Sequence, residues 1–246
     1  MSKNNEAPSE VRELEKQLNR FCYTNGFNKT EVFDDLLRYI IGYFTWKPSP
    51  LESWRYKKEH NVVFWNMLCE WIQVVQKQTF LHGWYDAFGD LFMACIGSTS
   101  RTKNLGQNFT PDEICELMAR MLESKAGKDK SCGTSIILDP TCGSGRTLLA
   151  AHLKHPKNYI VAEDIDRTCC MMTVCNFIVH GCHGEVIWHD SLNPDSYYGG
   201  WLVNEHLGRR GLPSVRAITK EESAIWTFWQ YQKQENAIQE ALELEK

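Results

Sequence analysis

The sequence of 246 residues lacks the patterns that mark several large classes of protein. No two of its ten cysteines are spaced as Cys-x-x-Cys, its first residues do not resemble a secretory signal, and no apolar run is long enough to span a membrane. Disulfide scaffolds and membrane-spanning proteins are therefore disfavoured. We expect a reduced, soluble, cytoplasmic protein with no metal site and no membrane contact.

The chain also lacks an excess of basic residues. Its 27 lysines and arginines are outnumbered by 31 acidic residues, which gives a formal net charge of -4. Proteins that hold nucleic acid over their whole surface usually carry a basic excess. The composition therefore disfavours a uniformly basic nucleic-acid binder, and it still allows a local basic patch.

Apolar residues recur at helical spacing through the first hundred residues. The pattern is clear at 33–41 and at 63–71, and the prolines of 47–50 interrupt it once. We predict a helical N-terminal domain over residues 1–100. Its tryptophans are interpreted as core residues rather than as a platform for stacking bases, and they are Trp46, Trp54, Trp65, Trp71 and Trp84.

The second half alternates short apolar runs with helical stretches. We expect strands at 135–138, 159–162, 186–188 and 201–203, and helices at 147–153 and 168–179. Strands that alternate with helices predict an α/β fold with a parallel sheet. This core is placed at 101–212, and residues 213–246 are expected to form a C-terminal helix or extension.

A glycine-rich loop follows the first of these strands. The segment Asp139-Pro140-Thr141-Cys142-Gly143-Ser144-Gly145 lies between a strand and a helix, where Gly143 and Gly145 let the backbone turn tightly and approach a ligand. It matches neither the Gly-x-Gly-x-x-Gly dinucleotide fingerprint nor the Gly-Lys-Ser/Thr ending of a phosphate-binding loop. The placement predicts a cofactor loop, with a purely structural turn as the alternative.

Acidic residues follow the next two strands. The second strand runs into Glu163-Asp164-Ile165-Asp166, about twenty residues after the glycines, and the third runs into Asp190. In a doubly wound sheet an acid at the first of these positions accepts hydrogen bonds from ribose hydroxyls, and we choose Asp164. Three polar sites at the carboxyl ends of parallel strands predict one binding crevice.

Two segments resemble a known family. Residues 106–111 (GQNFTP) are similar to the GQFFTP segment, and residues 139–145 (DPTCGSG) to the first cofactor motif, of the modification subunits of type I restriction systems and related N-6 adenine DNA methyltransferases. The resemblance implies a Rossmann-like core that binds S-adenosylmethionine, preceded here by the helical domain. It also implies DNA as a partner, together with a specificity subunit or another partner subunit.

The resemblance implies roles for individual residues. Asp139 would lie near the methionine amino group of the cofactor, Asp164 would bind the ribose, and Asp190 would lie beside the adenine ring. The segment that contains Phe109 would close over the methionine end. The full cofactor-binding set is Phe109, Thr110, Pro111, Asp139, Thr141, Gly143, Gly145, Asp164 and Asp190.

The catalytic motif of the family departs most from its usual form. The family carries Asn-Pro-Pro followed by an aromatic residue after its fourth strand, where the asparagine and a backbone carbonyl accept the hydrogens of the target adenine amine. Here Asn204-Glu205-His206-Leu207 occupies that place, and Asn204 is the first catalytic candidate. Asn193, which Pro194 follows, is the second candidate.

Two functions rank above a third, weaker reading, in which the chain is a structural fragment with an empty cofactor pocket whose helical N-terminal part mediates assembly. The first is an enzyme that transfers a methyl group to the N-6 amine of adenine in DNA. The alternative is a catalytically degraded relative that binds the cofactor and acts as a binding or assembly module. Because only 42 residues follow Asn204, we also expect a truncated sheet whose fourth strand is an open edge, covered by the terminal helix or by another chain.

Overall fold

The computed structural model describes residues 7–46, 55–96, 109–126, 135–193 and 195–244. Trp54, Pro194 and the first half of the predicted segment 106–111 lie outside the described residues. No helix in the described part of the chain is long and apolar enough to cross a membrane.

The first half of the chain is helical, as predicted. Its ends follow ordinary capping rules: Gly26 ends α1 in the left-handed conformation, and the side chain of Asn28 accepts the backbone N–H groups of Thr30 and Glu31 at the start of α2. The elements are η1 (Ser9–Val11), α1 (Arg12–Asn25), α2 (Lys29–Tyr43), α3 (His60–His82), α4 (Ala87–Cys95) and α6 (Asp112–Ala126).

A five-stranded sheet forms the second half, in the order β1-β2-β3-β4-β5. Strands β1 to β3 run parallel, whereas β4 is antiparallel to both β3 and β5. The strands are β1 (Ile136–Asp139), β2 (Tyr159–Asp164), β3 (Gly184–Trp188), β4 (Gly199–Val203) and β5 (Val215–Ile218). The α/β architecture is thus confirmed, but the expectation of an entirely parallel sheet is wrong.

The length of one connection explains this difference. Residues 189–198 join β3 to β4, and a crossover between parallel strands needs a dozen residues or more. The chain therefore returns antiparallel. Strand β4 lies between β3 and β5, so the expectation that it forms an open edge is also wrong, and the edges of the described sheet are β1 and β5.

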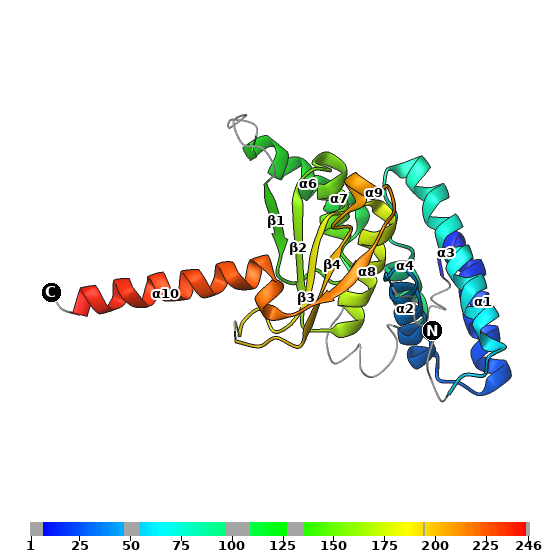
Figure 1. The fold of residues 1–246 in the computed structure, drawn as a ribbon. Helices are drawn as coiled ribbons and strands as arrows, with labels where there is room; N and C mark the ends of the chain where they lie inside the picture. The colour runs from blue at the N-terminus through cyan, green and yellow to red at the C-terminus, as the bar shows by residue number, and fades with distance from the viewer. Residues whose placement is uncertain (1–6, 47–54, 97–108, 127–134, 194, 245–246) are drawn as a thin grey trace, which may run out of the picture.

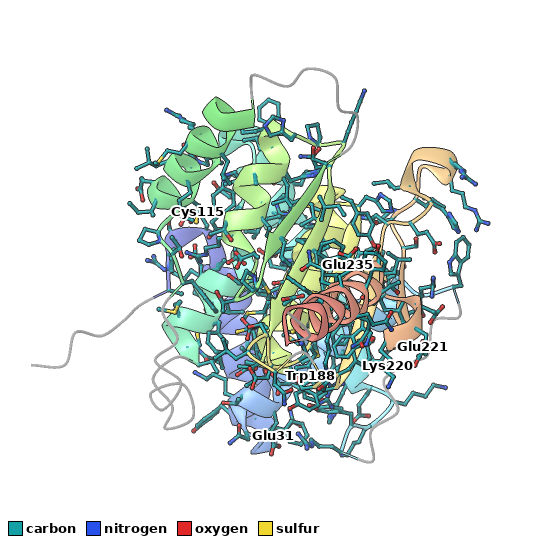
Figure 2. The ribbon with its side chains drawn as sticks, turned by 90° about the vertical axis from the view of Figure 1, so that its left-hand side faces the viewer. Glu31, Cys115, Trp188, Lys220, Glu221 and Glu235 are labelled. Atoms are coloured by element: carbon teal, nitrogen blue, oxygen red, sulfur yellow. The ribbon has the colours of Figure 1, made fainter. Side chains whose placement is uncertain are left out.

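The two faces of the sheet are covered unequally. Helices α7 (Arg146–Lys154) and α8 (Arg167–His180) pack on one face, and the N-terminal helices form further layers behind α8 (Figure 1). The other face is covered by the start of α10 (Ala224–Leu244), whose Ile225 and Trp229 pack against Val161 and Ile187. The rest of α10 extends away from the body (Figure 1), and Figure 2 shows this helix nearly end-on.

Helix α8 is the centre of the core. Nearly all of its side chains are buried between the sheet and α2, including Cys169, Cys170 and Cys175, which pack as small apolar groups. The prediction for the tryptophans holds only in part. Trp71 and Trp84 are buried, but Trp46 and Trp65 are 59% and 42% exposed.

The C-terminal segment also contains more than a helix. Besides η2 (Lys220–Glu222) and α10, residues 213–246 supply β5, which completes the sheet, and the short helix α9 (Leu207–Arg210) precedes them. The boundaries at residues 100 and 212 remain predictions.

Candidate functional site

The glycine-rich loop joins the end of β1 to the start of α7. Gly143 and Gly145 both adopt positive φ angles, 56° and 89°, which side chains with a Cβ rarely adopt. The backbone N–H of Gly143 donates to Oδ2 of Asp164 (2.9 Å), and the hydroxyl of Thr173 donates to the carbonyl of Gly143 (2.9 Å). Strand β2 and helix α8 therefore fix the shape of the loop.

A cavity of about 230 Å³ lies between this loop and the segment before α6. The predicted residues Phe109, Thr110, Asp139, Thr141 and Gly143 meet here. A Cβ on Gly143 would lie 3.1 Å from a ring carbon of Phe109, so the lack of a side chain on this glycine lets the loop and the ring lie this close together. The full lining is Phe109, Thr110, Met118, Asp139, Thr141, Cys142, Gly143, Ser144, Arg146 and Thr147.

Asp139 ends β1 with its carboxylate held in place. Oδ1 accepts the backbone N–H of Thr141 (3.1 Å), and Oδ2 accepts the hydroxyl of Thr147 from the first turn of α7. Because each carboxylate oxygen can accept more than one hydrogen bond, this wall of the cavity retains capacity for a cationic group.

Asp164 lies at the carboxyl end of β2, next to the loop. Its two oxygens accept the backbone N–H groups of Gly143 and Asp166 (2.8 Å). Burial raises its pKa, and these two hydrogen bonds oppose the rise. Asp164 thus supports the loop itself, and it does not line the cavity described above.

Asp190 and Asn193 lie beyond the carboxyl end of β3. Oδ1 of Asp190 accepts the backbone N–H of Leu192 (3.0 Å), and Oδ1 of Asn193 accepts that of Asp195 (3.2 Å). The preceding residue, His189, donates its backbone N–H to the carbonyl of Asp164 (3.1 Å), which places this turn beside β2. Asn193 is exposed there, at the same end of the strands as the loop.

Asn204 lies elsewhere. Because β4 is antiparallel to β3, its last residue, Val203, pairs with Gly184, the first residue of β3. Asn204 therefore follows β4 at the opposite end of the strands from the glycine-rich loop. Asn204 thus lies away from the cofactor cavity, for the same topological reason as the direction of β4, and its catalytic role stays a prediction.

The side chain of Asn204 is committed to the fold. It is 2% exposed, and its amide donates to the carbonyls of Phe177 (2.8 Å) and Cys182 (2.9 Å). Its Oδ1 accepts the backbone N–H of Ser214 (3.1 Å). Among the described residues other than glycine it alone has a positive φ, of 57°. These contacts join α8, β4 and the connection to β5.

An ionic network behind the loop was not predicted. Arg146, the first residue of α7, contacts Asp86 at the start of α4, and Asp90 and Asp112 also surround its guanidinium group. Asp86 and Arg146 are sixty positions apart, so no local pattern joins them. The available signals were an aspartate at a helix start and an arginine directly after the second glycine of the loop.

His180 is a partly buried polar group near this network. Its Nδ1 lies 2.8 Å from the carbonyl oxygen of Asn176, and its Nε2 lies 3.2 Å from the backbone N–H of Tyr85. These contacts require a neutral ring with the proton on Nδ1. Burial lowers the pKa of His180 to about 4, which agrees with that tautomer.

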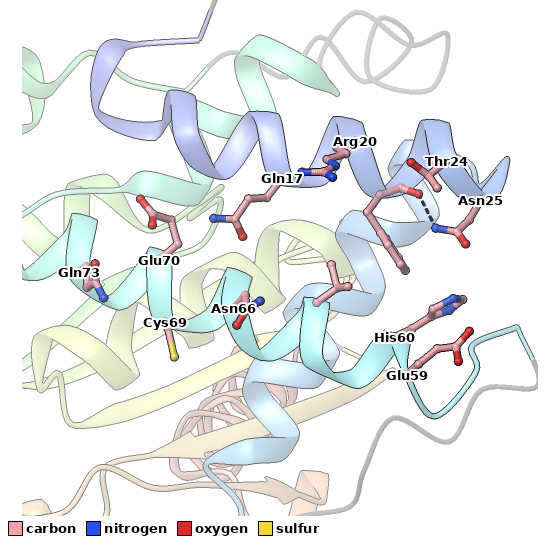
Figure 3. A pocket seen from close by; sticks show the side chains of 12 residues that line it. Gln17, Arg20, Thr24, Asn25, Glu59, His60, Asn66, Cys69, Glu70 and Gln73 are labelled. Atoms are coloured by element: carbon pink, nitrogen blue, oxygen red, sulfur yellow. Dashed lines mark hydrogen bonds between the residues drawn. The ribbon is translucent and has the colours of Figure 1, made fainter.

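A larger hollow lies between α1 and α3, away from the loop. Figure 3 shows this cavity of about 640 Å³, lined mainly by polar side chains, with the amide of Asn25 donating to the carbonyl of Phe21. None of the predicted cofactor residues lines it. Size alone therefore does not identify the candidate cofactor site. Among the described residues no group of acidic, histidine or cysteine side chains is arranged to hold a metal ion.

A glycine-rich turn between a strand and a helix, with an acid after the next strand, is the arrangement of α/β proteins that bind nucleotide-like cofactors. Within this class, residues 84–204 match the N-6 DNA methylase family. This match covers β1 to β4 and the ionic network. It confirms the predicted resemblance to N-6 adenine DNA methyltransferases.

Curated relatives are methylase subunits of type I restriction enzymes from Methanocaldococcus jannaschii. The MjaVIII subunit is 29% identical over 131 residues, which cover 50% of this chain and 22% of the relative. The MjaVII subunit is 27% identical over 150 residues, which cover 58% and 24%. The chain thus spans about a quarter or less of the length of these relatives. No solved structure matches.

Proposed function

We propose that this chain binds S-adenosylmethionine in the cavity beside the glycine-rich loop and takes part in methyl transfer to the N-6 amine of adenine in DNA. The cavity itself is the observation that carries the proposal. It brings the residues of two separate motifs, Phe109 with Thr110 and Asp139 with Gly143, onto facing walls.

The residues present suit this cofactor. S-adenosylmethionine carries positive charge on its amino group and its sulfonium, and the carboxylate of Asp139 offers a complementary charge at the cavity wall. Gly143 has no Cβ, so no side chain at this point of the loop enters the cavity or meets the Phe109 ring.

The remaining cofactor roles extend from this cavity. Asp164 and Asp190 receive the ribose and the adenine ring, while Thr141 and Gly145 shape the loop. Pro111 and Thr110 begin α6 over the methionine end. These assignments follow the positions of the family motifs.

Asn193 is the better candidate for holding the target amine. It lies on the loop edge of the sheet with an exposed side chain, whereas the amide of Asn204 is fully hydrogen-bonded inside the fold. Bound S-adenosylmethionine supplies an activated methyl group. When the adenine nitrogen takes up the methyl group it would release one proton to solvent, and the Asn193 oxygen would accept a hydrogen bond from the amine before the transfer.

DNA is the proposed substrate, and a specificity subunit or another partner subunit is the proposed companion, acting in the cytoplasm. The relatives are named as subunits of restriction enzymes, and the chain spans only part of their length. An acidic net charge also suits a protein that leaves part of its DNA contact to a partner.

A second candidate is a relative that holds the cofactor without transferring its methyl group. The comparisons favour the enzyme, because the matched proteins are named methylase subunits. One structural observation favours the alternative: the asparagine that occupies the expected catalytic place in sequence, Asn204, is built into the core.

Calorimetric titration with S-adenosylmethionine, followed by transfer of labelled methyl groups to mixed-sequence DNA, separates these candidates. We expect binding, and transfer that Asn193→Ala abolishes without weakening the binding. Binding without transfer in the native protein would favour the second candidate. Absence of binding would refute the cofactor site.

A further inference from the structure

Arg146 lies at the junction of three helices. It begins α7 directly after the glycine-rich loop, and its side chain is 10% exposed. Its Nε lies 2.7 Å from Asp86, its Nη2 lies 2.5 Å from Asp90, and its Nη1 lies 3.5 Å from Asp112. These carboxylates belong to the start of α4, to α4 itself and to the first residue of α6.

Two of the three carboxylates are anchored independently of Arg146. Asp86 also accepts the backbone N–H of Gly89 (2.8 Å), the hydroxyl of Ser144 (2.5 Å) and the amide of Asn176 (2.8 Å). Asp90 accepts the hydroxyl of Tyr85 (2.8 Å). The α4 side of the network is therefore rigid.

The third carboxylate depends on Arg146. Oδ1 of Asp112 is buried without a hydrogen bond in the described structure, and Nη1 of Arg146 lies 3.5 Å from it. Burial raises the pKa of Asp112; Arg146 opposes this rise, and Asp90 and Asp86 add to it. Without the arginine, three carboxylates would repel one another, and the start of α6 would be pushed outward.

Arg146 itself keeps its charge. Burial alone would lower its pKa, but the three neighbouring carboxylates outweigh that effect and raise it. Its guanidinium also lies 5.8 Å from the centre of the Phe109 ring, within the range of a cation–π contact. Arg146 thus lines the cavity itself, and it also contacts Phe109 on the facing wall and Asp112 at the start of α6.

We propose that Arg146 is a positioning residue, which holds the segment 109–112 against the glycine-rich loop and thereby sets the width of the cofactor cavity. This inference rests on the proposed function, because the benefit of a fixed width is cofactor binding. The ion pair with Asp112 is the contact through which Arg146 holds this segment, since the other two carboxylates lie on α4 or at its start.

A double-mutant cycle tests the ion pair between Arg146 and Asp112. The variants are Arg146→Gln, Asp112→Asn and the double variant, with S-adenosylmethionine affinity measured by calorimetry. We expect Arg146→Gln to weaken binding by about tenfold or more, and Asp112→Asn to produce most of that loss. The double variant should bind no more weakly than Arg146→Gln alone, because both changes break the same link.

Arg216→Gln is the matched control. Arg216 also pairs with two carboxylates, Glu205 (3.2 Å) and Glu222 (2.7 Å), but it lies on β5, beyond the cavity. Its loss should leave the affinity unchanged. Losses that add up in the double variant, or native affinity in Arg146→Gln, would overturn the proposal.

Hydrogen–deuterium exchange without ligand gives a second measurement. The backbone amides at the start of α6, such as that of Cys115, should exchange faster in both single variants than in the native protein. Asp112 is half-exposed, so Asp112→Asn should fold even if Arg146→Gln does not. Unchanged exchange in Asp112→Asn would refute the positioning role. If the variants exchange faster but the native protein binds no S-adenosylmethionine, the positioning role stands and the proposed function is refuted.

Discussion

Replacing Gly143 by alanine tests whether cofactor binding needs the close packing of the glycine-rich loop against Phe109. The added methyl group would lie 3.1 and 3.2 Å from two ring carbons of Phe109, which is closer than ordinary contact. The ring also contacts Phe92, with the two ring centroids 5.5 Å apart, and the guanidinium of Arg146, which lies 5.8 Å from its centroid, so displacing it disturbs both contacts.

The change has two separable costs. The left-handed φ of 56° costs an L-residue roughly 1–2 kcal/mol, and displacement of the Phe109 ring from its rotamer costs roughly 1 kcal/mol more. Gly26→Ala isolates the first cost, since Gly26 has a φ of 67° and nothing within 4 Å of its Cβ position. The difference between the two variants therefore reports on the contact with Phe109.

Urea denaturation and calorimetry measure both consequences. We expect Gly26→Ala to lose roughly 1–2 kcal/mol of unfolding free energy with no change in affinity for S-adenosylmethionine. Gly143→Ala should lose roughly 1 kcal/mol more and bind the cofactor at least about tenfold more weakly. Native affinity in Gly143→Ala, or an equal loss of affinity in both variants, would refute the cofactor-loop assignment.

Further predictions concern buried polar groups away from the loop. Asn204→Ala should reduce the unfolding free energy by roughly 3 kcal/mol, because three buried hydrogen bonds are lost, while calorimetry should show unchanged cofactor affinity. The pKa of His180 is depressed to about 4 in the folded protein, so its contribution to stability is present above the unfolded value of 6.5 and is lost as the pH falls towards 4. Denaturation curves between pH 6.5 and pH 4 should show a loss of roughly 3 kcal/mol of unfolding free energy. His180→Gln should remove this dependence on pH. Glu185→Gln should lower stability by roughly 1 kcal/mol and speed amide exchange at Ala224 and Ile225, whose N–H groups the carboxylate accepts at the start of α10.

Local patterns predicted the elements of this fold, and connection length decided how they are arranged. The four predicted strands are present because each is a short apolar run between turns. Their directions were not local properties: residues 189–198 are too few for a crossover, and the prediction did not weigh that limit. Strand β5 was missed because Val215-Arg216-Ala217-Ile218 is only four residues long and shows neither a continuous apolar run nor an alternation of apolar and polar residues.

The candidate site divides in the same way. Asp139, Gly143 and Asp164 could be placed from sequence because each lies at the end of a parallel strand or in the turn after it. The network of Arg146 with Asp86 could not, because it joins distant segments through side chains alone. The proposed positioning role of Arg146 depends on three carboxylates around one guanidinium, an arrangement that only the structure shows.

The antiparallel return of β4 also determines where a target base can be held. A group that accepts the amine of adenine must lie on the loop edge of the sheet, because the methyl donor is proposed to bind there. Strand β4 runs in the opposite direction and finishes at the other end of the sheet, so Asn204 cannot reach the cavity without unpairing β4 from β3. The turn after β3 is the part of the described chain that leaves the sheet at the correct edge, and it carries Asn193. The proposed methyl transfer would therefore depend on that turn or on a residue that a partner subunit supplies, and Asn193→Ala distinguishes these two sources.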